Sequence, residues 1–155
     1  MLSGYPEGVI FFMTSLAGCD HHPDTSTAPD TADVQAVSVS GSDGGYTFAV
    51  TIRSPDAGCE RYADWWEVVD TSGALRHRRI LDHSHTYEQP FTRTGSPVTV
   101  AAGEELYVRA HLSTGGYGAT MQGTAASDFV AAISLDADFA ASIEASEPQP
   151  GGCAF

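Results

Sequence analysis

Apolar residues at every second position are the feature that most constrains how this chain folds. Residues 46–52 alternate Tyr, Phe, Val and Ile with small or polar residues, directly after a Ser-Asp-Gly-Gly turn at 42–45. Residues 106–112 alternate in the same way. Side chains of a strand point to opposite faces in turn, so a period of two predicts β-strands with one buried face.

Further segments carry the same pattern between turn residues. A short aromatic and β-branched strand at 65–69, a Gly-containing turn and residues 74–81 predict a hairpin. Short strands are also expected at 37–39 and 98–100. Residues 133–143 alternate over their whole length and predict a last strand, although their alanines make a helix the rival interpretation.

About seven or eight short strands without a strong helical run indicate an all-β protein. The prediction is an immunoglobulin-like or fibronectin-like β-sandwich over residues 34–146. The pattern does not separate this topology from a jelly roll. At 155 residues the chain holds one domain of this size. Residues 147–155 are rich in Pro and Gly and are expected to form a C-terminal tail.

Charge is distributed unevenly along the chain. The formal net charge is −13, and all seven basic residues are arginines between Arg53 and Arg109. Nine of the 20 acidic residues lie within 46–117, and the others lie in flanks that contain no Lys or Arg. Nucleic-acid binding requires a basic surface, so it is not expected here. An acidic, self-repelling surface is expected of a soluble domain outside the cytoplasm.

The N-terminus carries an export pattern. Residues 9–17 form an apolar run that is too short to span a bilayer and fits the core of a signal peptide. The run ends in Leu16-Ala17-Gly18-Cys19, which resembles the lipobox of bacterial lipoproteins. The resemblance implies that residues 1–18 are removed, that Cys19 is lipidated, and that the protein is anchored to the membrane of the cell envelope, facing the periplasm or the exterior. Residues 19–33 are rich in Asp, Thr and Pro and predict a flexible acidic tether.

Two cysteines remain after such processing. An even number in an oxidising compartment predicts a disulfide between Cys59 and Cys153, which would hold the C-terminal tail. The alternative is that Cys59 is a thiolate metal ligand.

Three histidines form the candidate metal site. His83 and His85 make a His-x-His pair, whose imidazoles lie on one side of the chain if it is extended. His111 lies on the polar face of the predicted strand at 106–112. Imidazoles are common ligands of zinc and copper, and neighbouring strands can bring them together. The sequence therefore predicts a zinc or copper site at these three histidines, with Glu88 as a candidate fourth ligand.

Acidic residues of 64–67 have two interpretations. Asp64 or Glu67 can supply an oxygen ligand or orient an imidazole through its second nitrogen. They can equally form a polar network with the arginines of the same sheet. Trp65 and Trp66 are adjacent and must point to opposite faces, so at least one is expected in the core.

The functional prediction is an exported envelope lipoprotein whose sandwich binds a transition metal. The alternative is a metal-free binding, adhesion or structural module of the envelope. The sequence contains no nucleophile elbow, phosphate-binding glycine loop or helical metalloprotease motif. An enzyme is therefore the less favoured interpretation, and no activity is predicted. The protein or small-molecule partner is not predicted.

Overall fold

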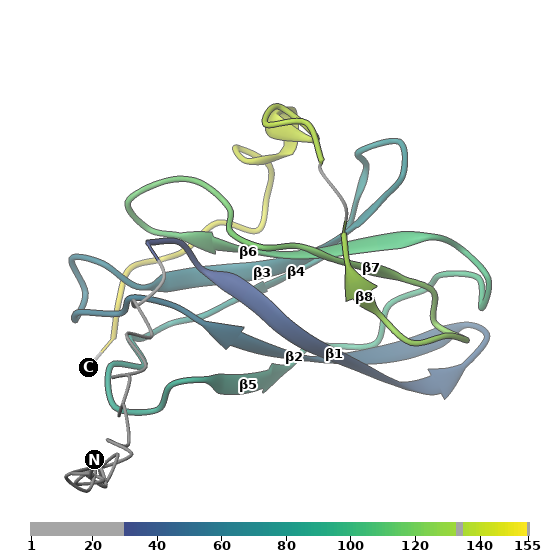
Figure 1. Cartoon of the computed structure of the whole chain (residues 1–155), viewed down its shortest axis with the longest axis horizontal. Helices are drawn as coiled ribbons and strands as arrows, with labels where there is room; N and C mark the ends of the chain where they lie inside the picture. The colour runs from purple at the N-terminus through teal and green to yellow at the C-terminus, as the bar shows by residue number, and fades with distance from the viewer. Residues whose placement is uncertain (1–29, 133–134, 155) are drawn as a thin grey trace, which may run out of the picture.

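The structure is a computed structural model that describes residues 30–132 and 135–154. These residues form eight β-strands and one short 3-10 turn (Figure 1). The strands are β1 (Asp33–Ser42), β2 (Gly45–Arg53), β3 (Ala63–Asp70), β4 (Leu75–Ile80), β5 (Phe91–Thr94), β6 (Leu106–Leu112), β7 (Met121–Gly123) and β8 (Val130–Ala131), and the turn is η1 (Ala141–Ile143). The predicted signal peptide, Cys19 and most of the tether lie outside the described residues.

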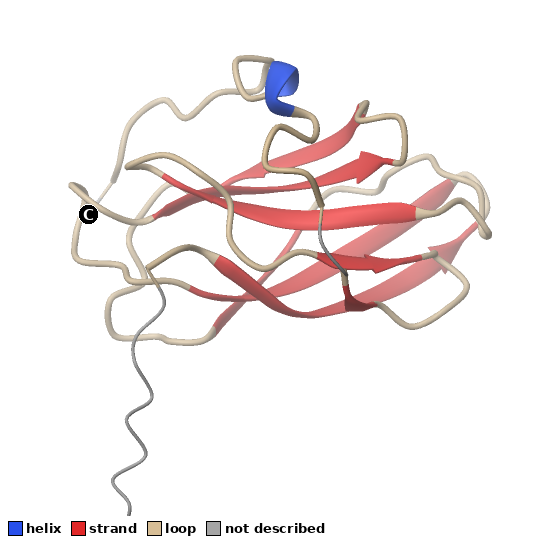
Figure 2. Ribbon diagram, turned by 45° about the horizontal axis from the view of Figure 1, so that its top comes forward, coloured by secondary structure: helices blue, strands red, loops and turns tan. Residues whose placement is uncertain are grey.

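The strands form two antiparallel sheets that pack as two layers (Figures 1 and 2). One sheet has the order β1-β2-β5 and the other the order β4-β3-β6-β7-β8. The all-β prediction and the expected number of strands are confirmed. In the part of the chain that the structure describes, no helix is long and apolar enough to cross a membrane.

The core lies between the two sheets and follows the period of two. On β2, Phe48, Val50 and Ile52 are fully buried while the residues between them are half-buried. The inner face of β6 contributes Leu106 and Val108 to the apolar cluster that contains these β2 residues. Alternation thus predicted the inner faces correctly, because each strand exposes only its other side.

Strand β3 is buried on both faces, unlike a strand with one face in solvent. Trp66 points into the core and Trp65 lies on the outer face, yet both are at least 97% buried, as is every residue from Ala63 to Val69 except Asp64. The cover on the outer face is the C-terminal segment, defined here as residues 135–154, which crosses the five-stranded sheet on the side away from β1, β2 and β5 (Figures 1 and 2).

The expected strand at 133–143 is wrong for the residues that are described. Residues 135–140 form coil and a turn, and 141–143 form η1. A strand needs a neighbouring strand for its backbone hydrogen bonds. Here the segment lies over the sheet instead of along its edge. Several of its carbonyl groups accept hydrogen bonds from arginine side chains rather than from a neighbouring strand.

The disulfide between Cys59 and Cys153 is confirmed, with the two Cα atoms 5.5 Å apart. It joins the loop after β2 to the end of the C-terminal segment. The amide of Ala154 also donates a hydrogen bond to the carbonyl of Asp82. Both contacts hold the end of the chain against the loops that follow β2 and β4, so Cys59 is not a free thiolate ligand.

Candidate functional site

The outer face of the five-stranded sheet is centred on a buried carboxylate. Glu67 on β3 has no exposed side-chain surface. Its Oε2 accepts a hydrogen bond from Arg78 Nε and its Oε1 accepts one from Arg109 Nε, each at 2.8 Å. The antiparallel register places both arginines directly opposite Glu67, one on each neighbouring strand. The predicted polar network is therefore confirmed at Glu67, but it is buried rather than exposed.

The two arginines connect this carboxylate to the C-terminal segment. Arg109 donates from Nη1 to the carbonyl of Phe139 at 2.8 Å and from Nη2 to that of Ala140 at 3.1 Å. Arg78 donates from Nη2 to the carbonyl of Ile143 at 2.8 Å, and from Nη1 to carbonyls at 144, 146 and 148. Charged donors satisfy carbonyl groups that no β-ladder reaches, which fixes the path of the segment.

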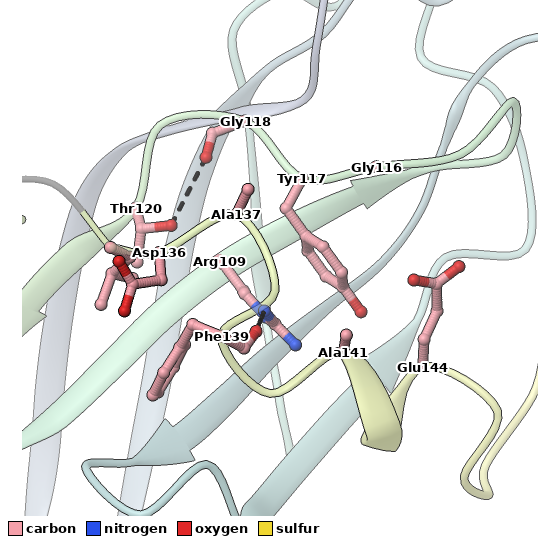
Figure 3. Close-up of a pocket in the computed structure, with 11 residues that line it drawn as sticks. Arg109, Gly116, Tyr117, Gly118, Thr120, Asp136, Ala137, Phe139, Ala141 and Glu144 are labelled. Atoms are coloured by element: carbon pink, nitrogen blue, oxygen red, sulfur yellow. Dashed lines mark hydrogen bonds between the residues drawn. The ribbon is translucent and has the colours of Figure 1, made fainter.

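A pocket of about 370 Å³ opens between the C-terminal segment and the loop after β6 (Figure 3). Tyr117 and Phe139 provide aromatic walls, and the Arg109 guanidinium lies 3.7 Å from the centre of the Tyr117 ring. Asp136 and Glu144 also line it. Arg109 is already paired with Glu67, so these two carboxylates carry the uncompensated charge of the pocket. Burial raises the pKa of Tyr117 to about 12, so its hydroxyl stays protonated at neutral pH.

His111 lies beside this pocket on β6. Its Nδ1 is 2.7 Å from Asp64 Oδ1, and its ring stacks on Trp65 with centroids 3.7 Å apart. Asp64 thus holds the imidazole through one nitrogen, which is one of the two roles that the sequence left open for it. The other nitrogen, Nε2, has no hydrogen-bond partner and lies 3.6 Å from Glu144 Oε1.

His83 and His85 lie in the loop between β4 and β5, where the chain is not extended as a strand. Their ring centroids are 4.5 Å apart, so the structure does bring this pair together. His85 is buried and stacks on Phe91 at 3.7 Å, and neither of its ring nitrogens has a hydrogen-bond partner. Burial, followed by the charge of Arg93, lowers the pKa of His85 to about 4.

Glu88, the candidate fourth ligand, pairs with an arginine. Its Oε2 accepts a hydrogen bond from Arg93 Nη2 at 2.7 Å. That hydrogen bond is the main reason that the pKa of Glu88 is lowered. Within residues 30–132 and 135–154, no group of three or more His, Cys, Asp or Glu side chains is arranged to hold a metal ion. The structure therefore does not bring His111 into such a group with His83 and His85, and the three-histidine site stays a prediction.

The pocket residues were not identified from the sequence as a site. The one signal in the sequence is the Gly115-Gly116-Tyr117-Gly118 loop, because three glycines in four residues favour unusual backbone angles or a close approach. Gly115 and Gly116 have φ of +104° and +90°, which favour glycine, and a Cβ at Gly118 would collide with the backbone of Ala32. Nothing in the sequence around 136–144 indicated that this segment would face that loop.

Comparison with known proteins finds a relative that is described as a lipoprotein. A protein of Halomicrobium mukohataei described as a "Putative lipoprotein" is 39% identical over 71 residues, which cover 46% of this chain. The match spans only 35% of the length of that relative. No family model matches the sequence, and no solved structure matches it. The similarity to a lipoprotein and the disulfide together indicate an extracytoplasmic location.

Proposed function

We propose that this protein is a lipid-anchored, extracytoplasmic binding module that takes a small organic cation in the pocket beneath its C-terminal segment. Cys19 would carry the lipid after removal of residues 1–18. The lipobox pattern and the similarity to a lipoprotein support the anchor. The two sheets, with strand orders β1-β2-β5 and β4-β3-β6-β7-β8, support a fibronectin-like sandwich.

The observation that carries the proposal is a pocket whose wall is held in place by ion pairs, hydrogen bonds and a disulfide of the protein itself. The Glu67–Arg78–Arg109 cluster binds the segment by its carbonyl groups, and the disulfide holds its end. Preorganised walls reduce the entropy lost on binding. The volume lies within the range of small-molecule sites, about 300–1,000 Å³. The carboxylates of Asp136 and Glu144 favour a positively charged ligand.

The test uses nuclear magnetic resonance titrations of the purified chain with butylammonium, agmatine and tetramethylammonium, and with neutral butanol as the uncharged probe. We expect saturable shifts of resonances from residues that line the pocket with at least one cation, and weaker shifts in Asp136→Asn. Asp128→Asn is the matched control because Asp128 is exposed and lies outside this pocket. Equal response to butanol, or equal binding by Asp136→Asn, would refute the proposal.

A second candidate is the transition-metal function, with zinc or copper bound by His83, His85 and His111. The short distance between the first two rings supports it. It requires His85, now stacked on Phe91, to turn a ring nitrogen toward the ion. Metal analysis of the purified chain is the test. Zinc or copper above background that is lost in His85→Ala would support this function. A purified chain without zinc or copper above background would exclude it.

A further inference from the structure

His111 differs from the other histidines of the domain because one ring nitrogen is bonded and the other faces an acidic side chain. Asp64 Oδ1 accepts the hydrogen bond at Nδ1, at 2.7 Å. In the neutral imidazole this places the proton on Nδ1 and leaves the lone pair on Nε2. The same arrangement of carboxylate and histidine orients ligating imidazoles in metal proteins and makes them more basic.

The free nitrogen is buried and has no partner. His111 is 95% buried, and Nε2 makes no hydrogen bond within the described residues. A buried polar atom without a hydrogen-bond partner is uncommon in folded proteins, so this nitrogen is a candidate position for a bound ion or water. Its nearest ionisable neighbour is Glu144 Oε1 at 3.6 Å.

The 3.6 Å distance between His111 Nε2 and Glu144 Oε1 indicates what can bridge these two atoms. It exceeds the usual length of a direct N–H···O hydrogen bond, about 2.7–3.2 Å. A water molecule bonded to both at about 2.8 Å would need an angle near 80° at its oxygen, far from tetrahedral. With a zinc ion about 2.0–2.1 Å from each atom, the angle between the two ligand atoms at the ion would be about 120°, close to the tetrahedral value. The spacing fits a metal ion better than a bridging water.

Glu144 is held in this position by its backbone. Its amide donates to the carbonyl of Ala141, and its own carbonyl accepts hydrogen bonds from Arg78 and from Gln149 Nε2. Its side chain is 49% exposed, which leaves an open path for an ion and for water. The Tyr117 hydroxyl, also buried without a hydrogen-bond partner, comes from the loop after β6 and points toward the C-terminal segment that carries Glu144 (Figure 3).

We propose that His111 Nε2 and Glu144 bind a divalent transition-metal ion, with Asp64 as the residue that positions the imidazole. Zinc, cobalt and copper accept one nitrogen and one carboxylate oxygen as ligands. Two protein ligands leave coordination positions for water or for a molecule in the pocket, and the Tyr117 hydroxyl can donate a hydrogen bond to that group. The set shares only His111 with the predicted three-histidine site. It shares Glu144 with the proposed cation pocket, in which Asp136 remains as the second carboxylate.

The test is titration of the purified chain with Co²⁺ and Zn²⁺ by calorimetry, together with the visible absorption spectrum of bound Co²⁺. The sequence also has two adjacent histidines, His21 and His22, in the predicted tether. All variants carry His21→Ala and His22→Ala, so that these histidines contribute no metal ligand. We expect one equivalent of metal. Glu144→Gln should weaken binding at least tenfold, and Asp64→Asn about 10- to 100-fold with an altered Co²⁺ spectrum.

Two variants serve as controls. Glu147→Gln removes an exposed carboxylate of the same segment, and His83→Ala removes a member of the three-histidine set, so both should bind like the parent chain. Urea unfolding without metal establishes that each variant is folded. Absence of saturable binding overturns the proposal, as does a Glu144→Gln variant that binds like the parent. Loss of binding in His83→Ala alone also overturns it and assigns the ion to the three histidines.

Discussion

The buried carboxylate of Glu67 provides the sharpest test of how this domain is held together. The change Glu67→Gln keeps the size of the side chain but leaves Arg78 and Arg109 without their negative partner, and both arginines are at least 95% buried. Removing one member of a buried ionic group costs about 3–5 kcal/mol, because the remaining charges stay away from water. Domains of this size have a total stability of about 5–15 kcal/mol. We therefore expect the melting temperature to fall by roughly 10–20 °C.

Urea unfolding at neutral pH measures the loss, and limited proteolysis reports on its location. Released arginines should bind the carbonyls of the C-terminal segment less well, so cleavage within 139–148 should increase under conditions where the sheets remain folded. Glu88→Gln is the matched control. It removes an ion pair with Arg93 in which the Glu88 side chain is 60% exposed, and such pairs contribute about 0–1 kcal/mol. The reasoning is refuted if both variants lose the same stability, or if cleavage of 139–148 is unchanged.

Two further predictions concern the disulfide and the buried imidazole of His85. Cys153→Ser opens a bridge that spans 94 residues of sequence, so urea unfolding should show a loss of up to about 4.7 kcal/mol; a variant as stable as the oxidised parent would contradict this. His85→Phe keeps an aromatic ring against Phe91 and removes a group whose pKa of about 4 lies below the unfolded value of about 6.5. Since the unfolded chain then binds more protons, the parent should lose on the order of 3 kcal/mol as pH falls from 6.5 to 4. Urea midpoints of parent and variant at pH 7.5 and 4.5 measure this difference. The parent should lose more stability than the variant at pH 4.5, and an equal loss in both proteins would contradict the role given to His85.

Local patterns in the sequence were sufficient for the longer strands, the inner faces and the disulfide. The expected strand at 98–100 forms only an isolated bridge at Val98, and the short strands β5, β7 and β8 were not predicted. Alternation at 46–52 and 106–112 marks one apolar face whatever the partner strands are, because the pleat itself alternates the side chains. Adjacent Trp65 and Trp66 had to point in opposite directions for the same reason, and Trp66 is the one in the core. The pairing of Cys59 with Cys153 followed from the compartment and from an even count.

Alternation misled at 133–143 because the same pattern can arise in a segment without a neighbouring strand. Whether such a segment becomes a strand depends on which donors meet its carbonyl groups. Those donors are Arg78 and Arg109, which lie at least 30 residues before the carbonyl groups that they bind.

The sequence by itself predicted export and was sufficient to predict an acidic, all-β domain whose C-terminal end is held by a disulfide. Only the tertiary structure decided which polar residues act together. The register of β3 with its two neighbours places Glu67 between two arginines, and the docked segment brings Glu144 beside His111, while His83 and His85 remain in another loop. Side chains that are close in sequence share a period, whereas contacts between distant residues depend on strand register and on the paths of loops, which no local pattern encodes.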